Sequence, residues 1–259
     1  IRAFRARGSP GCTGISGRLA FNTPSCAAWK STSSLQRIAT GRRGAEEGIE
    51  PPVKAPLHDA ARALQFVRSK AGEWNLDKQR IGATGGSAGA CSSLWLAFHD
   101  DLADPDSDDP VARESTRLMA AAPGQAQTSL DPEQMREWIP GITYGAHAFG
   151  IQRMEDREAQ FQTFLAARDD LLAKGWIQEY SPYELVSVDD PPIFQNYGGR
   201  GIEEAPGEKG WKAHSPLFGV GLKRRLDELG VENYLTYDGK PAQKYGHPLE
   251  FFIAKLKKE

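Results

Sequence analysis

A serine between glycines offers the clearest chemistry in this sequence. Ser87 stands in the run Thr-Gly-Gly-Ser-Ala-Gly-Ala, and residues 85–89 match the pattern G-x-S-x-G. That pattern places a serine on a sharp turn between a strand and a helix, where its hydroxyl is exposed. The helix N-terminus beneath it favours the negative charge that develops when a hydroxyl attacks a carbonyl. The pattern therefore indicates a nucleophile, and a structural serine in an ordinary glycine loop is the alternative.

The segments on either side of Ser87 fit such a turn. The residues RIGAT (80–84) predict a short strand directly before it. The run ACSSLWLAF (90–98) is apolar on most sides, which is typical of a buried helix. Residues 57–74 carry apolar side chains at helical spacing and predict an amphipathic helix before the strand. The glycines two residues before and two residues after Ser87 would let the strand and the helix pass close together.

Further along the chain, strands and helices alternate. The sequence predicts three more strands and two more helices, over residues 117–123, 191–199 and 231–239 for the strands and 216–230 and 247–259 for the helices. Such alternation predicts an α/β fold, a doubly wound and mostly parallel sheet with helices on both faces. Residues 124–180 interrupt the alternation, and we expect them to form a helical cap or lid insertion. With this insertion, residues 46–259 would form one domain.

The composition limits the function classes. A chain of 259 residues with 39% hydrophobic residues and a net charge of −2 can bury the core of one globular domain. No apolar run approaches the roughly 20 residues that span a membrane, and the three cysteines have no metal-binding spacing. We therefore expect no membrane span, no metal and no cofactor. No signal-peptide pattern is present, which favours a cytoplasmic location. The chain begins with Ile1 rather than Met, so the question whether a segment precedes it stays open.

The first 45 residues have a different character. They hold seven Arg, one Lys and no Asp or Glu, and they lack the apolar runs that strands need. A basic segment of this kind can bind nucleic acid, but we expect no nucleic-acid role and predict an irregular segment. A shift of reading frame is a second hypothesis, because another frame over residues 29–40 could encode an apolar strand. The nucleotide sequence of the gene would decide it.

Three segments resemble a known class of hydrolases. Residues 77–110 resemble the nucleophile region of the α/β-hydrolase esterases and lipases, in particular the carboxylesterase group with a Gly-Gly-Ser-Ala-Gly elbow. Residues 181–199 resemble the approach to the acid loop, and residues 226–239 the last helix and strand before the histidine loop. The resemblance implies hydrolysis of carboxylic esters through an acyl-enzyme, by a Ser-acid-His triad in that chain order. It implies Ser87 as the nucleophile and the backbone N–H of Ala88 as an oxyanion donor.

The resemblance narrows the choice of the base. The chain has five histidines, and the family places its catalytic histidine after the last strand. His247 is predicted to be the base, although it comes about four residues later than usual. His214, before the helix that precedes the last strand, is the alternative base, or it simply precedes a helix start. We expect His58 and His99 to lie on helices away from the site, and His147 could line a substrate pocket.

The acid of the triad departs from the family pattern. The family has an aspartate near the position of Trp211, where no carboxylate stands. Glu204 is predicted to be the acid, with Glu203 and Glu208 as alternatives in the same loop. Each of these glutamates could equally be a solvated loop residue.

The oxyanion loop also departs from the family pattern. The family has a His-Gly-Gly type of loop some 70 to 75 residues before the nucleophile. Residues 8–17 stand at about that distance and have the glycines but no histidine, and few residues precede them. We therefore expect the first strands of the fold to be absent.

The sequence as a whole favours a serine hydrolase that acts on a small-molecule carboxylic ester. Two alternatives stay open: a catalytically impaired or non-catalytic hydrolase-fold binding protein, and a serine peptidase. Four aromatic residues of the insertion could line an apolar acyl pocket, namely Trp138, Tyr144, Phe149 and Trp176. The oligomeric state is open.

Overall fold

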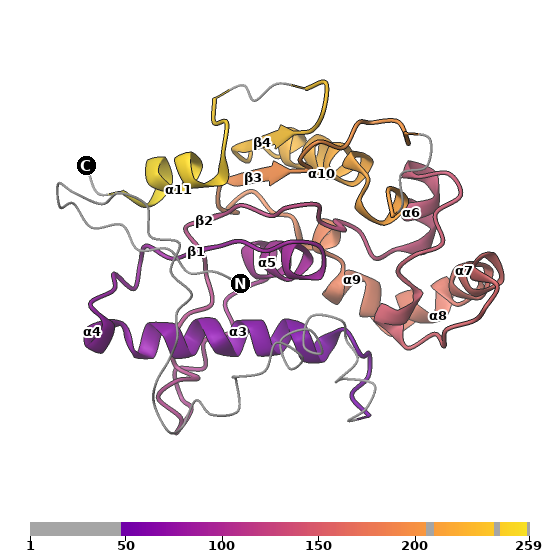
Figure 1. Ribbon diagram of the computed structural model, residues 1–259. Helices are drawn as coiled ribbons and strands as arrows, with labels where there is room; N and C mark the ends of the chain where they lie inside the picture. Colours follow the sequence, from indigo (N-terminus) through magenta and orange to yellow (C-terminus); the bar gives the residue numbers. More distant parts are fainter. Residues whose placement is uncertain (1–47, 206–209, 241–243, 258–259) are drawn as a thin grey trace.

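The computed structural model describes residues 48–205, 210–240 and 244–257 (Figure 1). The predictions for residues 1–45, including the glycines at 8–17 and the altered reading frame, lie outside the described residues, as does the candidate acid Glu208.

Four short strands form one parallel sheet in chain order. They are β1 (Gly82–Ala83), β2 (Ala120–Ala121), β3 (Ile193–Asn196) and β4 (Asn233–Thr236). Each strand pairs with the next in parallel. The four strands lie where the sequence predicts them, so the predicted parallel α/β architecture is confirmed.

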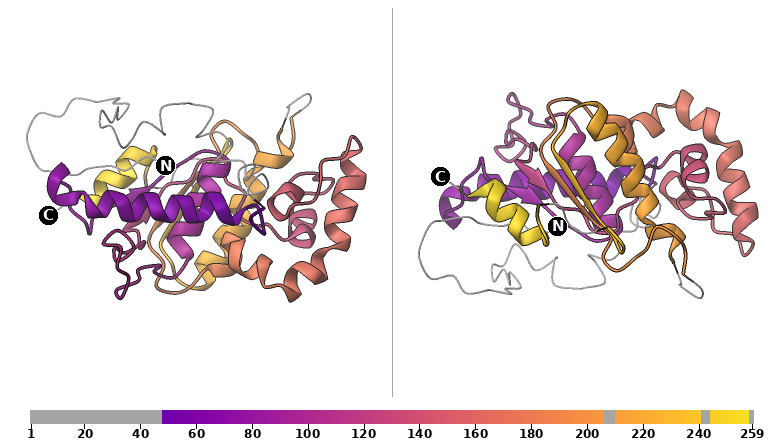
Figure 2. Two further views of the ribbon diagram at one scale, coloured as in Figure 1. Left: turned by 90° about the horizontal axis from the view of Figure 1, so that it is seen from below. Right: turned by 90° about the horizontal axis from the view of Figure 1, so that it is seen from above.

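Helices cover both faces of this sheet, as the alternating pattern predicts. They are α3 (Lys54–Ser69), α4 (Ala71–Trp74), α5 (Ala88–Phe98), α10 (Pro216–Glu228) and α11 (Pro248–Leu256). Leu94 of α5 and Leu222 of α10 pack against Ile193 on one face. Phe251 of α11 packs against Phe194 on the other. Figure 2 shows α10 and α11 on opposite sides of the strands, and α3 lies on the outside of α5.

A glycine in the first strand allows the last helix to approach closely. A Cβ added to Gly82 would stand 2.5 Å from a ring carbon of Phe252 in α11. A side chain at this position would therefore push the helix away from the sheet. The short strand β1, which leads into Ser87, is fixed between this helix and α5.

The segment between β2 and β3 is helical. It contains α6 (Pro132–Trp138), η2 (Ala146–Phe149), α7 (Arg157–Ala166), α8 (Arg168–Ala173), α9 (Trp176–Tyr180) and η3 (Pro182–Leu185). Helices α6, α7 and α8 gather at one end of the molecule (Figures 1 and 2). Asp131 caps α6 by accepting from the Glu133 N–H, and its carboxylate pairs with Arg168 at 2.8 Å. Within the described ranges, no helix combines the length and the apolar character needed to cross a membrane.

Candidate active site

Ser87 lies on the sharp turn between β1 and α5 that the sequence pattern predicts. Its φ of 53° and ψ of −121° are in a region that non-glycine residues rarely adopt. The Ser87 N–H donates to the Gly124 carbonyl over 3.0 Å, which ties the turn to the segment after β2. Cys91 N–H in turn donates to the Ser87 carbonyl at 3.0 Å, so the helix starts directly on the turn.

The glycines of the pattern have unequal roles in this turn. A Cβ added to Gly85 would stand 2.5 Å from the carbonyl carbon and oxygen of Gly89. A Cβ added to Gly86 or to Gly89 would meet nothing within 4 Å. The close approach of strand and helix therefore requires a residue without a side chain at position 85.

His214 is the histidine that faces Ser87. Its Nε2 lies 2.8 Å from the Ser87 Oγ, and its Nδ1 lies 3.3 Å from the Gly210 carbonyl oxygen. A carbonyl oxygen only accepts, so Nδ1 carries the proton and Nε2 is free to accept the serine hydroxyl proton. Burial lowers the pKa of His214 from its usual 6.5, and the positive charge of Arg200 lowers it further, against the hydrogen bond to Gly210. The imidazole is therefore neutral at pH 7.

The loop between β3 and α10 carries this histidine. His214 ends the short helix η4 (Lys212–His214), and Ser215 then caps α10 by accepting from the Leu217 N–H. Trp211 is buried, and its indole N–H donates to the Gly201 carbonyl over 3.1 Å. Gly210 has a φ of 72°, which turns its carbonyl toward His214 in a conformation that glycine adopts at no steric cost.

Gln127 is a residue of this region that the sequence reasoning missed. Its side chain is buried, and its amide donates to the carbonyl of Ala213, the residue directly before His214. It comes shortly after β2, so it lies at the same edge of the sheet as Ser87. The only sequence signal is a glutamine in the run AAPGQAQTS, which is rich in small residues.

The structure does not bring His247 to Ser87. His247 is exposed and caps α11, with its Nδ1 accepting from the Leu249 N–H over 3.1 Å. The predicted arrangement is therefore corrected: the alternative, His214, holds the place next to the serine. The physical reason is that Pro248 is the first residue of α11. The N–H groups at the start of a helix have no partner within the helix, and one of them donates to the ring of the preceding histidine.

The predicted acid does not contact the imidazole either. Glu204 is exposed, and its carboxylate lies 3.8 Å from the ammonium group of Lys212. Glu203 is also exposed. Among the residues that the structure describes, no carboxylate is hydrogen-bonded to His214 Nδ1, and the carbonyl of Gly210 occupies that position.

The backbone N–H of Ala88, the predicted oxyanion donor, lies at the N-terminus of α5. Ala88 is the first residue of α5, and its N–H has no hydrogen-bond partner within the described part of the chain. The first N–H groups of a helix lack an intrahelical acceptor and point out of its N-terminus, with the positive end of the helix dipole. This N–H is therefore free to bind a negatively charged oxygen beside Ser87.

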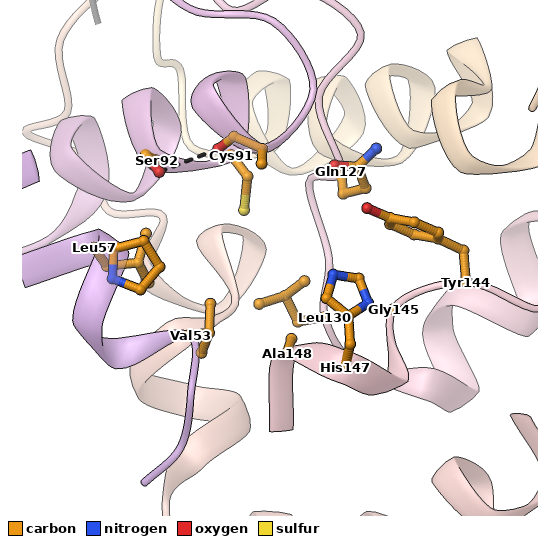
Figure 3. A pocket seen from close by; sticks show the side chains of 12 residues that line it. Val53, Leu57, Cys91, Ser92, Gln127, Leu130, Tyr144, Gly145, His147 and Ala148 are labelled. Carbon is orange, nitrogen blue, oxygen red and sulfur yellow. Dashed lines mark hydrogen bonds between the residues drawn. The ribbon is translucent and has the colours of Figure 1, made fainter. Parts of the chain in front are cut away.

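A small pocket adjoins the serine turn (Figure 3). Its volume is about 50 Å³, and its walls come from the start of α3, the first turns of α5 and the segment 127–148. Two candidates from the sequence line it, Tyr144 and His147. The other three aromatic candidates are not among its lining residues: Trp138 packs on Tyr183, and Phe149 stacks on Trp176.

Comparison with known proteins assigns the chain to a family. The model of the BD-FAE family, a family of α/β-hydrolase-like esterases, matches residues 49–200, which is more than half of the chain. The chain therefore belongs to the BD-FAE family. No curated protein matches it.

Solved structures share the fold. An acetyl ester-xyloside bifunctional hydrolase from Caldicellulosiruptor lactoaceticus is 23% identical, with a TM-score of 0.50 over 78% of this chain and 60% of that chain. A truncated carbohydrate esterase from gut microbiota is 20% identical, with a TM-score of 0.46 over 71% and 58%. A thermophilic esterase from the Planctomycetes species Thermogutta terrifontis is 20% identical, with a TM-score of 0.46 over 82% and 63%. The chain thus spans about three fifths of the length of these proteins, and the first likeness shows the α/β-hydrolase fold.

Proposed function

We propose that this protein hydrolyses carboxylic esters, with Ser87 as the nucleophile and His214 as the general base. The observation that carries the proposal is the 2.8 Å hydrogen bond between Ser87 Oγ and His214 Nε2. The two residues come from different loops, 127 positions apart, and meet at the edge where the parallel strands end. An activated nucleophile needs a base within hydrogen-bond reach, and the base needs a group that fixes its tautomer. The bond from Nδ1 to Gly210 supplies that group.

The geometry supports a two-step reaction. The Ser87 Oγ attacks the ester carbonyl carbon while its proton passes to His214 Nε2, and the carbonyl oxygen becomes an oxyanion beside the Ala88 N–H. The bond to the alcohol then breaks, and the departing alkoxide takes the proton from Nε2. A water molecule next attacks the acyl-enzyme, with His214 again accepting a proton. Transfer of that proton back to Ser87 releases the carboxylic acid.

A neutral carbonyl at Nδ1 has an energetic consequence. It fixes the imidazole, but it stabilises the imidazolium of the transition state less than a carboxylate would. The nearby charge of Arg200 also disfavours the imidazolium. With the described residues alone, the site therefore supports a dyad that is slower than a full triad.

The helical segment fits the role of a cap in this proposal. Residues 124–180 supply Leu130, Tyr144 and His147 to the wall of the pocket, opposite the first turns of α5. A cap that closes one side of the acyl site would hold the ester in place and limit its contact with water.

A fluorophosphonate probe tests the proposal. Such probes react with activated serines, so wild-type protein should be labelled on Ser87 and should hydrolyse p-nitrophenyl acetate, and Ser87→Ala should do neither. Ser93→Ala is a matched control, because the buried Ser93 hydroxyl donates to the Gly89 carbonyl on the same helix and Ser93 does not line the pocket. Folded protein that is neither labelled nor active would instead support a binding function. Labelling with hydrolysis of peptide substrates but not of esters would support a peptidase.

A further inference from the structure

Four side chains pack together around the C-terminal end of α5, away from Ser87. Trp95 is fully buried there, and its ring centroid lies 5.5 Å from that of His58 in α3 and 4.4 Å from that of His99 at the end of α5. The Trp95 indole N–H donates over 2.9 Å to the carbonyl of Glu179 in α9. We call His58, Trp95, His99 and Glu179 the Trp95 joint. The joint attaches α9, a short helix of the segment between β2 and β3, to the helix that begins at the serine turn (Figure 1).

His99 is placed to carry a proton on both ring nitrogens. Its Nε2 lies 3.0 Å from the carboxylate of Glu179, and its Nδ1 lies 2.9 Å from the carbonyl oxygen of Asp100. A carbonyl oxygen and an ionised carboxylate only accept, so the imidazolium satisfies both contacts and neither neutral tautomer does. The His99 side chain is only 12% exposed, so water competes little for this pair. Arg117 contacts the same residue through the backbone, where its guanidinium donates to the His99 carbonyl over 3.4 Å. The side-chain contacts of His99 therefore favour its charged form.

His58 has the opposite environment. Its Nε2 is buried and has no hydrogen-bond partner among the described residues. In the imidazolium form this atom would be a charged donor without an acceptor, which is costly in a protein interior. Burial lowers the pKa of His58 from its usual 6.5, and the positive charges of Lys54 and His99 lower it further. The carboxylates of Glu179 and Asp59 act in the other direction without cancelling these effects. His58 is therefore neutral at pH 7.

A further proton on the joint would disrupt it. The carboxylate of Glu179 would then face two positive rings, and the buried Nε2 of His58 could reach water only if the Trp95 ring or α9 moved. We propose that the Trp95 joint attaches α9 to α5 in a pH-dependent way and releases α9 in acid, when His58 takes up a proton beside the charged His99. Because the folded chain binds this proton less readily than the unfolded chain, the joint is at full strength above about pH 6.5 and weakens as the pH falls below that value. Helix α9 is the element that yields, because it has five residues, whereas α3 has 16.

Hydrogen exchange of the backbone amides tests this proposal in the whole protein. In the wild type, the protection of residues 176–185 should fall by about tenfold between pH 7 and pH 5, after correction for the intrinsic exchange rate. A tenfold difference in proton affinity between the closed and the opened joint changes the opening equilibrium by the same factor. The protection of α10 provides the reference, since its Leu222 and Leu226 are fully buried in the core. An equal fall in both segments, or no fall in residues 176–185, would overturn the proposal.

Two histidine variants locate the response. His58→Leu fills the site with an apolar side chain that takes up no proton, so residues 176–185 should keep their protection at pH 5 within about twofold of the value at pH 7. His147→Leu is the matched control and should respond like the wild type. Burial also lowers the pKa of His147, in the same helical segment, but its ring contacts Tyr144 rather than Trp95. A full acid response in His58→Leu, or its loss only in His147→Leu, contradicts the role of His58. His58→Gln serves the same purpose if the leucine variant fails to fold.

Two glutamate variants test the acceptor side of the joint. Glu179→Gln removes the carboxylate that faces His99, so the protection of residues 176–185 should be lower than in the wild type by about threefold already at pH 7. Glu158→Gln is the matched control, because Glu158 belongs to the same helical segment and pairs over 3.0 Å with Arg136, outside the joint. Equal protection of residues 176–185 in the two glutamate variants would contradict the proposal.

Discussion

At the level of single residues, the proposed chemistry depends on His214. Its ring joins the Ser87 hydroxyl to the Gly210 carbonyl, and no carboxylate among the described residues takes part in this chain of hydrogen bonds. The pH dependence of the reaction therefore reports mainly on the imidazole itself.

The first prediction concerns that pH dependence. Only neutral imidazole accepts the serine proton, and burial together with Arg200 lowers the pKa of His214 below 6.5. The value of kcat/KM should rise with pH, with a midpoint below 6.5, and stay level above it. Arg200→Gln should move the midpoint upward, because it removes the nearby positive charge. The exposed Arg224 on α10 offers Arg224→Gln as a control that leaves the midpoint in place. A wild-type midpoint above 6.5 would instead indicate a carboxylate that stabilises the imidazolium.

The second prediction concerns the glycines of the serine turn. Gly85→Ala should destabilise the protein by roughly 1–3 kcal/mol and abolish labelling of Ser87, because the new Cβ would overlap the Gly89 backbone. Gly86→Ala should be tolerated, since a Cβ there meets nothing within 4 Å. Thermal unfolding and fluorophosphonate labelling of both variants measure the difference. Equal behaviour of the two variants would contradict the close approach of Gly85 to the Gly89 backbone.

At the scale of elements, the site depends on how the segment after β2 is joined to η4. Gln127 makes that connection through the Ala213 carbonyl. We expect Gln127→Met, which keeps the size of the side chain but removes the donor, to lower kcat by about tenfold. A less well positioned histidine that raises the activation free energy by about 1.4 kcal/mol has that effect. The Gln127→Met variant should also have a broader pH profile of kcat, because His214 then adopts more than one position.

A second buried amide provides the control for Gln127. Gln195 is fully buried on β3, and its amide donates to the Gly219 carbonyl in α10 over 3.4 Å. Gln195→Met should reduce thermal stability with little effect on the pH profile. If the two variants lose stability equally and keep the wild-type profile, Gln127 is only a packing residue.

Much at the element scale could be predicted from the sequence. The four strands and the turn at Ser87 follow from local patterns, such as the short strand pattern of residues 80–84 and the glycines that follow it. These features depend on neighbouring residues, which a sequence displays directly. The base could not be chosen in the same way, because His214 and His247 each stand within two residues of the proline that begins a helix. What distinguishes them is a contact that no local pattern displays, the hydrogen bond between His214 Nε2 and the Ser87 hydroxyl, 127 positions away.

At the scale of the whole molecule, the parallel topology gathers the site. Ser87 follows β1, Gln127 follows β2 and His214 follows β3, so three consecutive crossovers deliver their residues to one edge of the sheet. The helical segment between β2 and β3 then supplies one side of the pocket next to them. The described part of the chain thus brings a serine and a histidine together beside a pocket.

The most direct test of the account compares the two histidines. His214→Gln and His247→Gln should be assayed side by side for p-nitrophenyl acetate hydrolysis and for the rate of Ser87 labelling, with folding checked by circular dichroism. The account predicts that His214→Gln loses at least about 10² in kcat, the contribution of a general base, while His247→Gln keeps wild-type activity. Full activity in His214→Gln together with loss of activity in His247→Gln would contradict it.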